Sequence, residues 1–145
     1  MDWAEAPRAY SSGMARILVV DDDADIVKLV VRRLQHANHR VHGAHNAAEA
    51  LAIVEEKGAP EILILDVEMP EVGGLELLGQ LRALSGEVAL PAIFLSGRMR
   101  PEDIEAGRKL GAVYLTKPFV ANALLSAIDA IIEAKQRREA PAEEW

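Results

Sequence analysis

Short apolar runs separated by amphipathic stretches are the feature that most constrains the fold of this chain. The runs lack the polar alternation of a half-exposed strand, so each suits a strand that is covered on both faces, as in a parallel sheet. The stretches between them repeat apolar side chains with the helical period. The four clearest runs are 17–20, 62–65, 92–95 and 113–115.

Start and stop signals frame the predicted helices. Asp23 and Asn46 stand as N-caps ahead of apolar stripes, and Gly74 and Pro101 open two further helical stretches. A weaker strand at 40–44 fills the gap between the first two helices. The sum is five strands alternating with five helices, an α/β fold. Right-handed crossovers would make it a doubly wound, five-stranded parallel sheet with helices on both faces. The last helix has the clearest apolar stripe, formed by Leu124, Leu125, Ile128, Ile131 and Ile132.

Polar side chains follow four of the five predicted strands. Ligands of open parallel sheets bind beyond the carboxyl ends of the strands, so these side chains are expected at one rim. They are Asp21 and Asp22 after the first strand, Asp66 after the third, Ser96 (followed by Gly97) after the fourth and Lys117 after the fifth.

This set of residues suits metal-assisted phosphoryl transfer. Crowded carboxylates repel one another and are tolerated mainly where a cation or a shared proton relieves the repulsion. Mg²⁺ fits, because it takes one or two carboxylates and leaves room for a phosphate. A carboxylate held between the metal and an ammonium group is a candidate phosphoryl acceptor, which assigns Asp66 as acceptor and Lys117 as the ammonium. Ser96 offers a hydroxyl donor, and Gly97 leaves the approach open.

Composition limits what such a pocket serves. The 145 residues, 50% of them hydrophobic, fit one domain with a substantial core. A formal charge of -7 argues against direct binding of nucleic acid. The chain has no cysteine, no apolar run long enough to span a membrane and no signal-peptide pattern at Met1, so we expect a cytoplasmic protein.

Four stretches together resemble the receiver domain of two-component response regulators, over about residues 15–136. The resemblance implies a flavodoxin-like fold with strand order 2-1-3-4-5. It also implies that Asp66 is phosphorylated by the phosphohistidine of a sensor histidine kinase or a histidine phosphotransfer protein. The stretches are ILVVDDD (17–23), LDVEMP (65–70), FLSG (94–97) and YLTKPF (114–119).

The same resemblance implies roles for individual residues. Tyr114 would be the switch that turns inward as Ser96 moves toward the phosphoryl group, which changes the surface around the fourth helix, fifth strand and fifth helix. Ser96 and Lys117 would hold the phosphoryl oxygens, and the Lys117–Pro118 bond is expected to be cis. The implied ligands of Mg²⁺ are Asp22, Asp66 and the backbone carbonyl of Glu68, with Asp21 acting through a metal-bound water.

Two charged residues suggest a gate beside the acceptor. Glu68 lies two residues after Asp66, and Arg98 lies two residues after Ser96. If their opposite charges pair across the phosphoryl site, they restrict the water that hydrolyses the acyl phosphate. The alternative is two solvated side chains, because exposed pairs contribute only about 0–1 kcal/mol.

For the whole chain, we expect a flexible extension (1–14), a receiver domain (15–136) and a flexible tail (137–145). The leading interpretation is a stand-alone, single-domain regulator that signals through protein contacts, either as a monomer or as a homodimer formed on phosphorylation. It is not expected to be an enzyme beyond its own phosphorylation and autodephosphorylation. Open alternatives are a phosphorelay shuttle, a fragment of a larger regulator or hybrid kinase, and an adaptor that is never phosphorylated.

A phosphatase of the haloacid dehalogenase superfamily is the enzyme alternative. Such enzymes also use an aspartyl nucleophile, Mg²⁺, a Ser or Thr, and a Lys. They resemble this chain less, because their Asp-x-Asp nucleophile motif comes early and their acidic pair comes last. Here the order is reversed, and residues 66–68 lack the second Asp.

Overall fold

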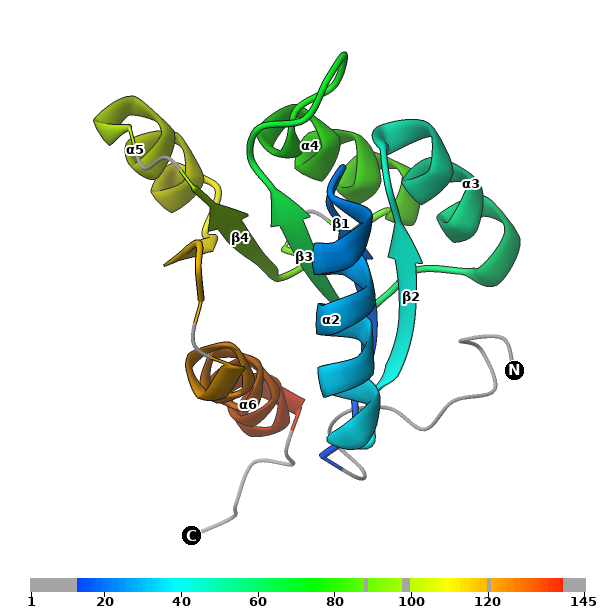
Figure 1. The fold of residues 1–145 in the computed structure, drawn as a ribbon. Helices are drawn as coiled ribbons and strands as arrows, with labels where there is room; N and C mark the ends of the chain where they lie inside the picture. The colour runs from blue at the N-terminus through cyan, green and yellow to red at the C-terminus, as the bar shows by residue number, and fades with distance from the viewer. Residues whose placement is uncertain (1–12, 88, 98–99, 120, 140–145) are drawn as a thin grey trace, which may run out of the picture.

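Strands and helices alternate along the whole of the computed structural model, which describes residues 13–87, 89–97, 100–119 and 121–139 (Figure 1). The strands are β1 (Arg16–Val20), β2 (Arg40–Ala44), β3 (Ile62–Asp66), β4 (Ala92–Ser96) and β5 (Val113–Thr116). The helices are α2 (Ala24–His36), α3 (Ala47–Lys57), α4 (Gly74–Ser85), α5 (Pro101–Lys109) and α6 (Ala121–Glu139).

The five strands form one parallel sheet in the order β2-β1-β3-β4-β5, which confirms the predicted order. The register brings the carboxyl ends of the strands to one edge. Val20 at the end of β1 lies level with Leu65, and Ser96 at the end of β4 lies level with Thr116. The loops that follow β1, β3, β4 and β5 therefore meet at that rim, as the sequence predicted.

Each face of the sheet has its own core, because successive side chains of a strand point to opposite faces. On one face, Ile17 and Val19 of β1 pack with α2 and α6. On the other, Leu18 and Val20 pack with α3 and α4. Figure 1 shows the two layers of helices, with α2 and α6 on one side of the strands. Burial of each such side chain stabilises the fold by about 1.5–3 kcal/mol.

The last helix follows its predicted stripe. α6 has 19 residues, and Leu124, Ile128 and Ile132 are buried against the sheet while its remaining sides are more exposed. This half-polar pattern belongs to a surface helix. Within the described part of the chain, no helix combines the length and the apolar character that crossing a bilayer requires.

The structure confirms the two predicted N-caps, Asp23 and Asn46. The Asp23 side chain accepts hydrogen bonds from the backbone N–H groups of Asp25 (2.9 Å) and Ile26 (3.3 Å). Asn46 Oδ1 accepts from the N–H of Glu49 at 2.8 Å. The Glu49 carboxylate accepts from the N–H of His45 at 2.7 Å. In a capping box the third helical residue accepts from the N–H of the cap residue itself, so this contact is displaced by one residue. The cap at Asp23 fixes the start of α2 directly beside the rim.

Buried polar contacts fasten the opposite end of the sheet. Glu61 accepts from the N–H of Arg16 (3.1 Å) and its Nε (3.3 Å), and the ammonium of Lys135 on α6 lies 3.8 Å away. Nδ1 of the buried His39 accepts from the N–H of Ala15 at 3.0 Å, and burial lowers the pKa of His39. These contacts are structural and lie away from the rim.

Candidate functional site

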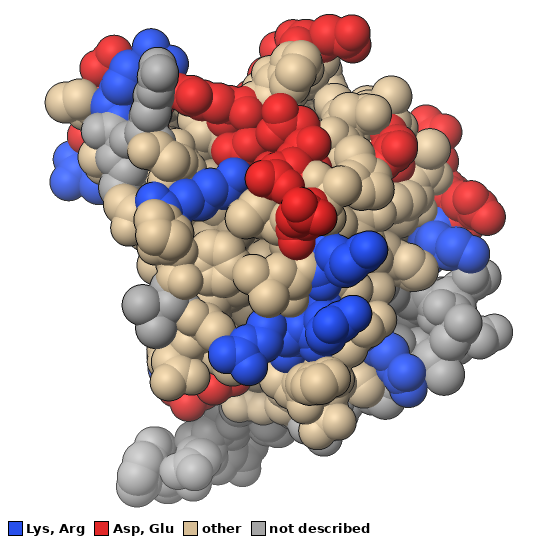
Figure 2. Space-filling model, viewed as in Figure 1, with Lys and Arg blue, Asp and Glu red and all other residues tan. Residues whose placement is uncertain are grey.

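Three carboxylates converge at the carboxyl end of the sheet. Asp21 and Asp22 follow β1, Asp66 ends β3, and their oxygens lie within 4.8 Å of one another. Asp21 and Asp66 are buried, with exposed fractions of 1% and 5%, whereas Asp22 is exposed. Figure 2 shows acidic side chains gathered on the surface at the start of α2. This is the acidic cluster that the sequence predicted.

Backbone hydrogen bonds orient the two buried carboxylates. Oδ1 of Asp21 accepts from the N–H of Asp23 at 2.9 Å, and the N–H of Asp21 donates to the carbonyl of Ala44 on β2 at 3.2 Å. Oδ1 of Asp66 accepts from the N–H of Glu68 at 3.3 Å. Each carboxylate is thus fixed by the loop that follows its own strand.

Lys117, which follows β5, reaches this cluster. Its Nζ lies 2.6 Å from Oδ2 of Asp21 and 3.6 Å from Oδ1 of Asp66. The sequence placed Lys117 beside Asp66, but in the structure the closer contact is with Asp21. The Lys117–Pro118 peptide bond is cis, as predicted.

The loop after β4 completes the rim. Ser96 is buried, and its carbonyl accepts from the N–H of Lys117 at 2.8 Å, so the ends of β4 and β5 are joined beside the carboxylates. Gly97 is exposed, and a Cβ built on it would meet no atom within 4 Å. Among the described residues, nothing therefore crowds the position of Gly97.

Comparison with known proteins decides the family. Residues 17–129 match the family model of the response regulator receiver domain. This chain belongs to that family. The match covers the acidic cluster, Ser96 and Lys117.

Similar proteins include both longer regulators and isolated receiver domains. The transcriptional regulatory protein TrcR of Mycobacterium tuberculosis is 35% identical over 130 residues, which are 89% of this chain and 49% of TrcR. This chain thus spans about half the length of the transcriptional regulators it matches. Among solved structures, the chemotaxis protein CheY4 of Vibrio cholerae has a TM-score of 0.75 at 33% identity, covering 81% of this chain and 98% of CheY4. A CheY-like receiver domain protein of Methanospirillum hungatei has a TM-score of 0.77 at 28% identity, covering 88% and 99%.

The electrostatics of the receiver pocket leave Asp66 poorly compensated. Burial, then the charge of Asp21, raise the pKa of Asp66 to about 7, and a hydrogen bond with Asp22 acts in the same direction. Burial by itself lowers the pKa of Lys117, but its contact with Asp21 and the charges of Asp21 and Asp66 outweigh it, so this pKa is raised. The pocket therefore keeps the Lys117 side chain protonated, and it still lacks positive charge close to Asp66. Hard oxygen ligands with excess negative charge fit Mg²⁺.

Gly74, which was predicted to open a helix, has a second role. A Cβ on Gly74 would lie 2.1 Å from the carbonyl oxygen of Asp66, and the N–H of Gly74 donates to the carbonyl of Val67 at 3.0 Å. Only glycine lets α4 begin this close to the backbone of the acidic residue. The position of a glycine eight residues after Asp66 is the one sequence signal for this contact.

Tyr114 on β5 lies between β4 and α5. Its ring packs on Phe94 with centroids 5.2 Å apart, and its hydroxyl donates to the carbonyl of Asp103. A Cβ on Gly107 would come within 2.2 Å of the Tyr114 ring, so this glycine makes the space that the ring fills. The half-buried ring thus contacts both the strand that carries Ser96 and the helix after it.

Glu68 contacts Arg100, a residue that the sequence did not single out. Nη2 of Arg100 lies 3.4 Å from Oε1 of Glu68, and its Nε lies 3.2 Å from Oδ2 of Asp103. Arg98, the expected partner of Glu68, lies outside the described residues, so that pairing stays a prediction. Both Arg100 and Glu68 are exposed, at 57% and 42% of their side chains. Sequence spacing alone did not indicate Arg100.

The raised pKa of Asp66 predicts a pH-dependent, metal-sensitive stability. The folded-state pKa of about 7 exceeds the ordinary aspartate pKa of 3.8, so ionisation of Asp66 costs stability as pH rises from about 4 through 7. Without metal, Asp66→Asn should raise the free energy of unfolding at pH 8 by at least about 1 kcal/mol and leave it nearly unchanged at pH 4. Mg²⁺ should stabilise the wild type at pH 8 far more than Asp66→Asn.

Denaturant titrations at both pH values, with Mg²⁺ and with a chelator, measure these effects. Glu55→Gln removes an exposed carboxylate on α3 and is the matched control. Equal stabilisation by the Asp66 and Glu55 substitutions, or an equal Mg²⁺ response in all three proteins, contradicts the prediction.

Proposed function

We propose that this chain is a response regulator that accepts a phosphoryl group on Asp66 from the phosphohistidine of a sensor histidine kinase or a histidine phosphotransfer protein. The observation that carries the proposal is the position of the Lys117 ammonium, 2.6 Å from Asp21 and 3.6 Å from Asp66, inside a cluster of carboxylates. One phosphoryl group on Asp66 would mark each chain as switched on, and we propose that partner proteins recognise this state through protein contacts.

In the proposed reaction, an Asp66 carboxylate oxygen attacks phosphorus, a P–O bond forms, and the P–N bond of the phosphohistidine breaks with its electron pair leaving on the nitrogen. The Lys117 ammonium, whose pKa is raised, stays protonated and receives one phosphoryl oxygen. The hydroxyl of Ser96 and the N–H of Gly97 donate to others. These donors stand at the ends of β4 and β5, which the sheet holds fixed.

Mg²⁺ would be held by Asp22, Asp66 and the backbone carbonyl of Glu68, and Asp21 would act through a metal-bound water. Its contribution when bound is to neutralise the carboxylates and the phosphoryl oxygens. The closeness of Asp21, Asp22 and Asp66 supports this ligand set.

Phosphorylation of Asp66 can be tested directly by intact mass. Incubation with acetyl phosphate and Mg²⁺ should add one phosphoryl group to the wild type and none to Asp66→Asn. Asp25→Asn, which removes an exposed carboxylate at the start of α2, is the matched control and should be labelled like the wild type. Labelling of Asp66→Asn at the wild-type level would place the acceptor elsewhere.

The same experiment separates this proposal from a phosphatase. A receiver domain stops at one phosphoryl group per chain and releases it slowly, whereas a phosphatase turns over its substrate. Repeated turnover of p-nitrophenyl phosphate, abolished by Asp66→Asn, would favour the enzyme of the haloacid dehalogenase type.

The organisation of the chain is proposed as well. Residues 15–136 form the proposed receiver domain, with 1–14 and 137–145 as proposed flexible extensions. Residues 1–12 and 140–145 lie outside the described residues, and residues 137–139 continue α6. A single-domain regulator and a phosphorelay shuttle both fit the site, as does the receiver part of a longer protein of the kind the transcriptional regulators represent. Sizing before and after phosphorylation distinguishes a monomer from a phosphorylation-dependent homodimer.

We further propose that Ser96 and Tyr114 carry the signal to the surface formed by α5, β5 and α6. A phosphoryl group brings close to two negative charges and draws Ser96 inward, which frees space for the ring. The support is the contact of Tyr114 with Phe94, two residues before Ser96, and with the backbone of α5.

Tyr114→Ala tests this switch. It should leave phosphorylation of Asp66 intact but reduce the changes in amide NMR shifts that phosphorylation causes in α5, β5 and α6. Tyr114→Phe keeps the ring, loses only the hydrogen bond to Asp103, and should retain most of the response. Undiminished shift changes in Tyr114→Ala would exclude Tyr114 as the switch.

The proposed gate over the acceptor involves Glu68 and Arg98, and the structure adds Arg100 as a described partner of Glu68. If the Glu68–Arg100 pair restricts the water that hydrolyses the acyl phosphate, Glu68→Ala and Arg100→Ala should each speed autodephosphorylation. The increase should be at most about fivefold, because an exposed ion pair contributes at most about 1 kcal/mol. Arg98→Ala measures the other arginine in the same assay. Arg108→Ala, which breaks an exposed pair with Glu105 elsewhere on α5, is the control. Identical rates in all variants reject the gate.

A further inference from the structure

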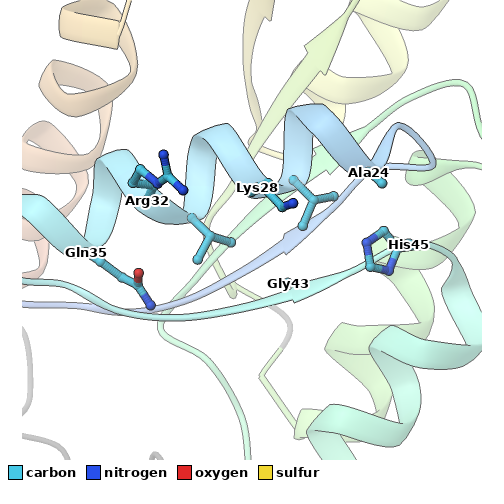
Figure 3. A pocket seen from close by; sticks show the side chains of 8 residues that line it. Ala24, Lys28, Arg32, Gln35, Gly43 and His45 are labelled. Atoms are coloured by element: carbon cyan, nitrogen blue, oxygen red, sulfur yellow. The ribbon is translucent and has the colours of Figure 1, made fainter.

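The angle between α2 and the edge strand β2 holds a groove of about 410 Å³ that the proposed phosphoryl transfer does not use. Figure 3 shows it from close by, with Lys28, Arg32 and Gln35 projecting from α2 and His45 at the end of β2. Val27 and Val31 form its apolar wall, and Gly43 lies at its base. We call this hollow the basic groove.

Gly43 shapes the base of the basic groove. A Cβ at this position would lie 2.5 Å from Cγ1 of Val27 and 3.2 Å from Cγ2 of Val31. Glycine therefore allows α2 to pack directly on the backbone of β2. Because β2 is an edge of the sheet, one side of its backbone has no neighbouring strand within the described part of the chain. The groove thus combines an apolar wall with an open strand edge.

The charge of the basic groove is opposite to that of the chain. Lys28 and Arg32 are exposed, stand one helical turn apart, and have no acidic side chain within ion-pair distance among the residues the structure describes. Figure 2 shows basic side chains on the surface below the acidic rim. Like charges four residues apart on a helix repel each other, so an acidic ligand would relieve a repulsion that the free protein carries.

We propose that the basic groove binds an acidic, extended segment of a partner protein. Four residues of helix rise about 6 Å, and two residues of an extended strand rise about 6.6 Å. Acidic side chains at positions i and i+2 of such a segment therefore match the spacing of Lys28 and Arg32. Small apolar side chains of the segment would contact Val27 and Val31, and its backbone would run along the outer edge of β2.

Other anionic surfaces fit this groove less well. Only two of the exposed cations, Lys28 and Arg32, line the groove, and it lies beside an acidic rim, whereas a lipid surface or a nucleic acid backbone is recognised by a broad positive area. The concave apolar wall and the strand edge add nothing to binding of a free anion. The observations therefore favour a protein segment.

Fluorescence anisotropy with two short labelled peptides tests the proposal. In one peptide Glu and Val alternate; in the other Lys replaces each Glu. The wild type should bind the acidic peptide and not the basic one, more weakly as salt rises. K28E/R32E should weaken binding of the acidic peptide at least about tenfold. R33E/K109E makes the same change in net charge at exposed positions outside the groove and should retain most of the affinity.

Two further measurements guard against misfolding and misplacement. K28Q/R32Q should also lose affinity, and acetyl phosphate should label Asp66 in every variant as in the wild type. Amide NMR shifts caused by the acidic peptide should centre on α2 and β2. Equal losses in K28E/R32E and R33E/K109E, or shifts centred on another face, would overturn the proposal. Phosphatidylserine vesicles and inorganic phosphate are tested as alternative anionic ligands. If the acidic peptide shows no saturable binding, the proposal is also overturned, even if the vesicles or phosphate bind.

Discussion

The crowding of Asp21, Asp22 and Asp66 at the end of two adjacent strands is the constraint on which the rest of the site depends. Lys117 compensates part of the negative charge, but it lies a full ångström closer to Asp21 than to Asp66. The carboxylate that remains under-compensated is the one with the raised pKa. The pocket is thus prepared to accept further positive charge at Asp66.

The sheet turns this local electrostatics into a fixed geometry. Parallel strands deliver the ends of β1, β3, β4 and β5 to one edge, and hydrogen bonds such as that from Lys117 to Ser96 hold neighbouring ends together. Glycines allow the remaining close approaches: Gly74 lets α4 begin against the backbone of Asp66, and Gly107 makes room for Tyr114. Each is a position where a larger residue would displace an element that supports the site.

Sequence patterns predicted the helices and strands and the residues that lie at the rim, but not which rim side chains contact each other. Uniform apolar runs identified the strands, and strand ends identified the rim residues, because both depend only on local order along the chain. The covered-strand expectation was wrong for the run at 113–115, because β5 lies at the edge of the sheet and has no buried residue. The preference of Lys117 for Asp21, and the contact of Arg100 with Glu68, depend on side-chain direction, which spacing does not encode. The same holds for Gly74 and Gly107, whose need for a missing Cβ arises from elements distant in sequence.

The helix α2 joins two surfaces of opposite charge. Its N-cap, Asp23, is hydrogen-bonded to Asp21 in the acidic cluster, while Lys28 and Arg32 line the basic groove further along. The net charge of -7 hides this separation, because it sums the two surfaces. Lys28 and Arg32 form no ion pair with the carboxylates of the cluster among the described residues, so the groove and the acidic cluster are separate sites. The two surfaces can therefore be altered independently by substitution, even though one rigid helix carries both.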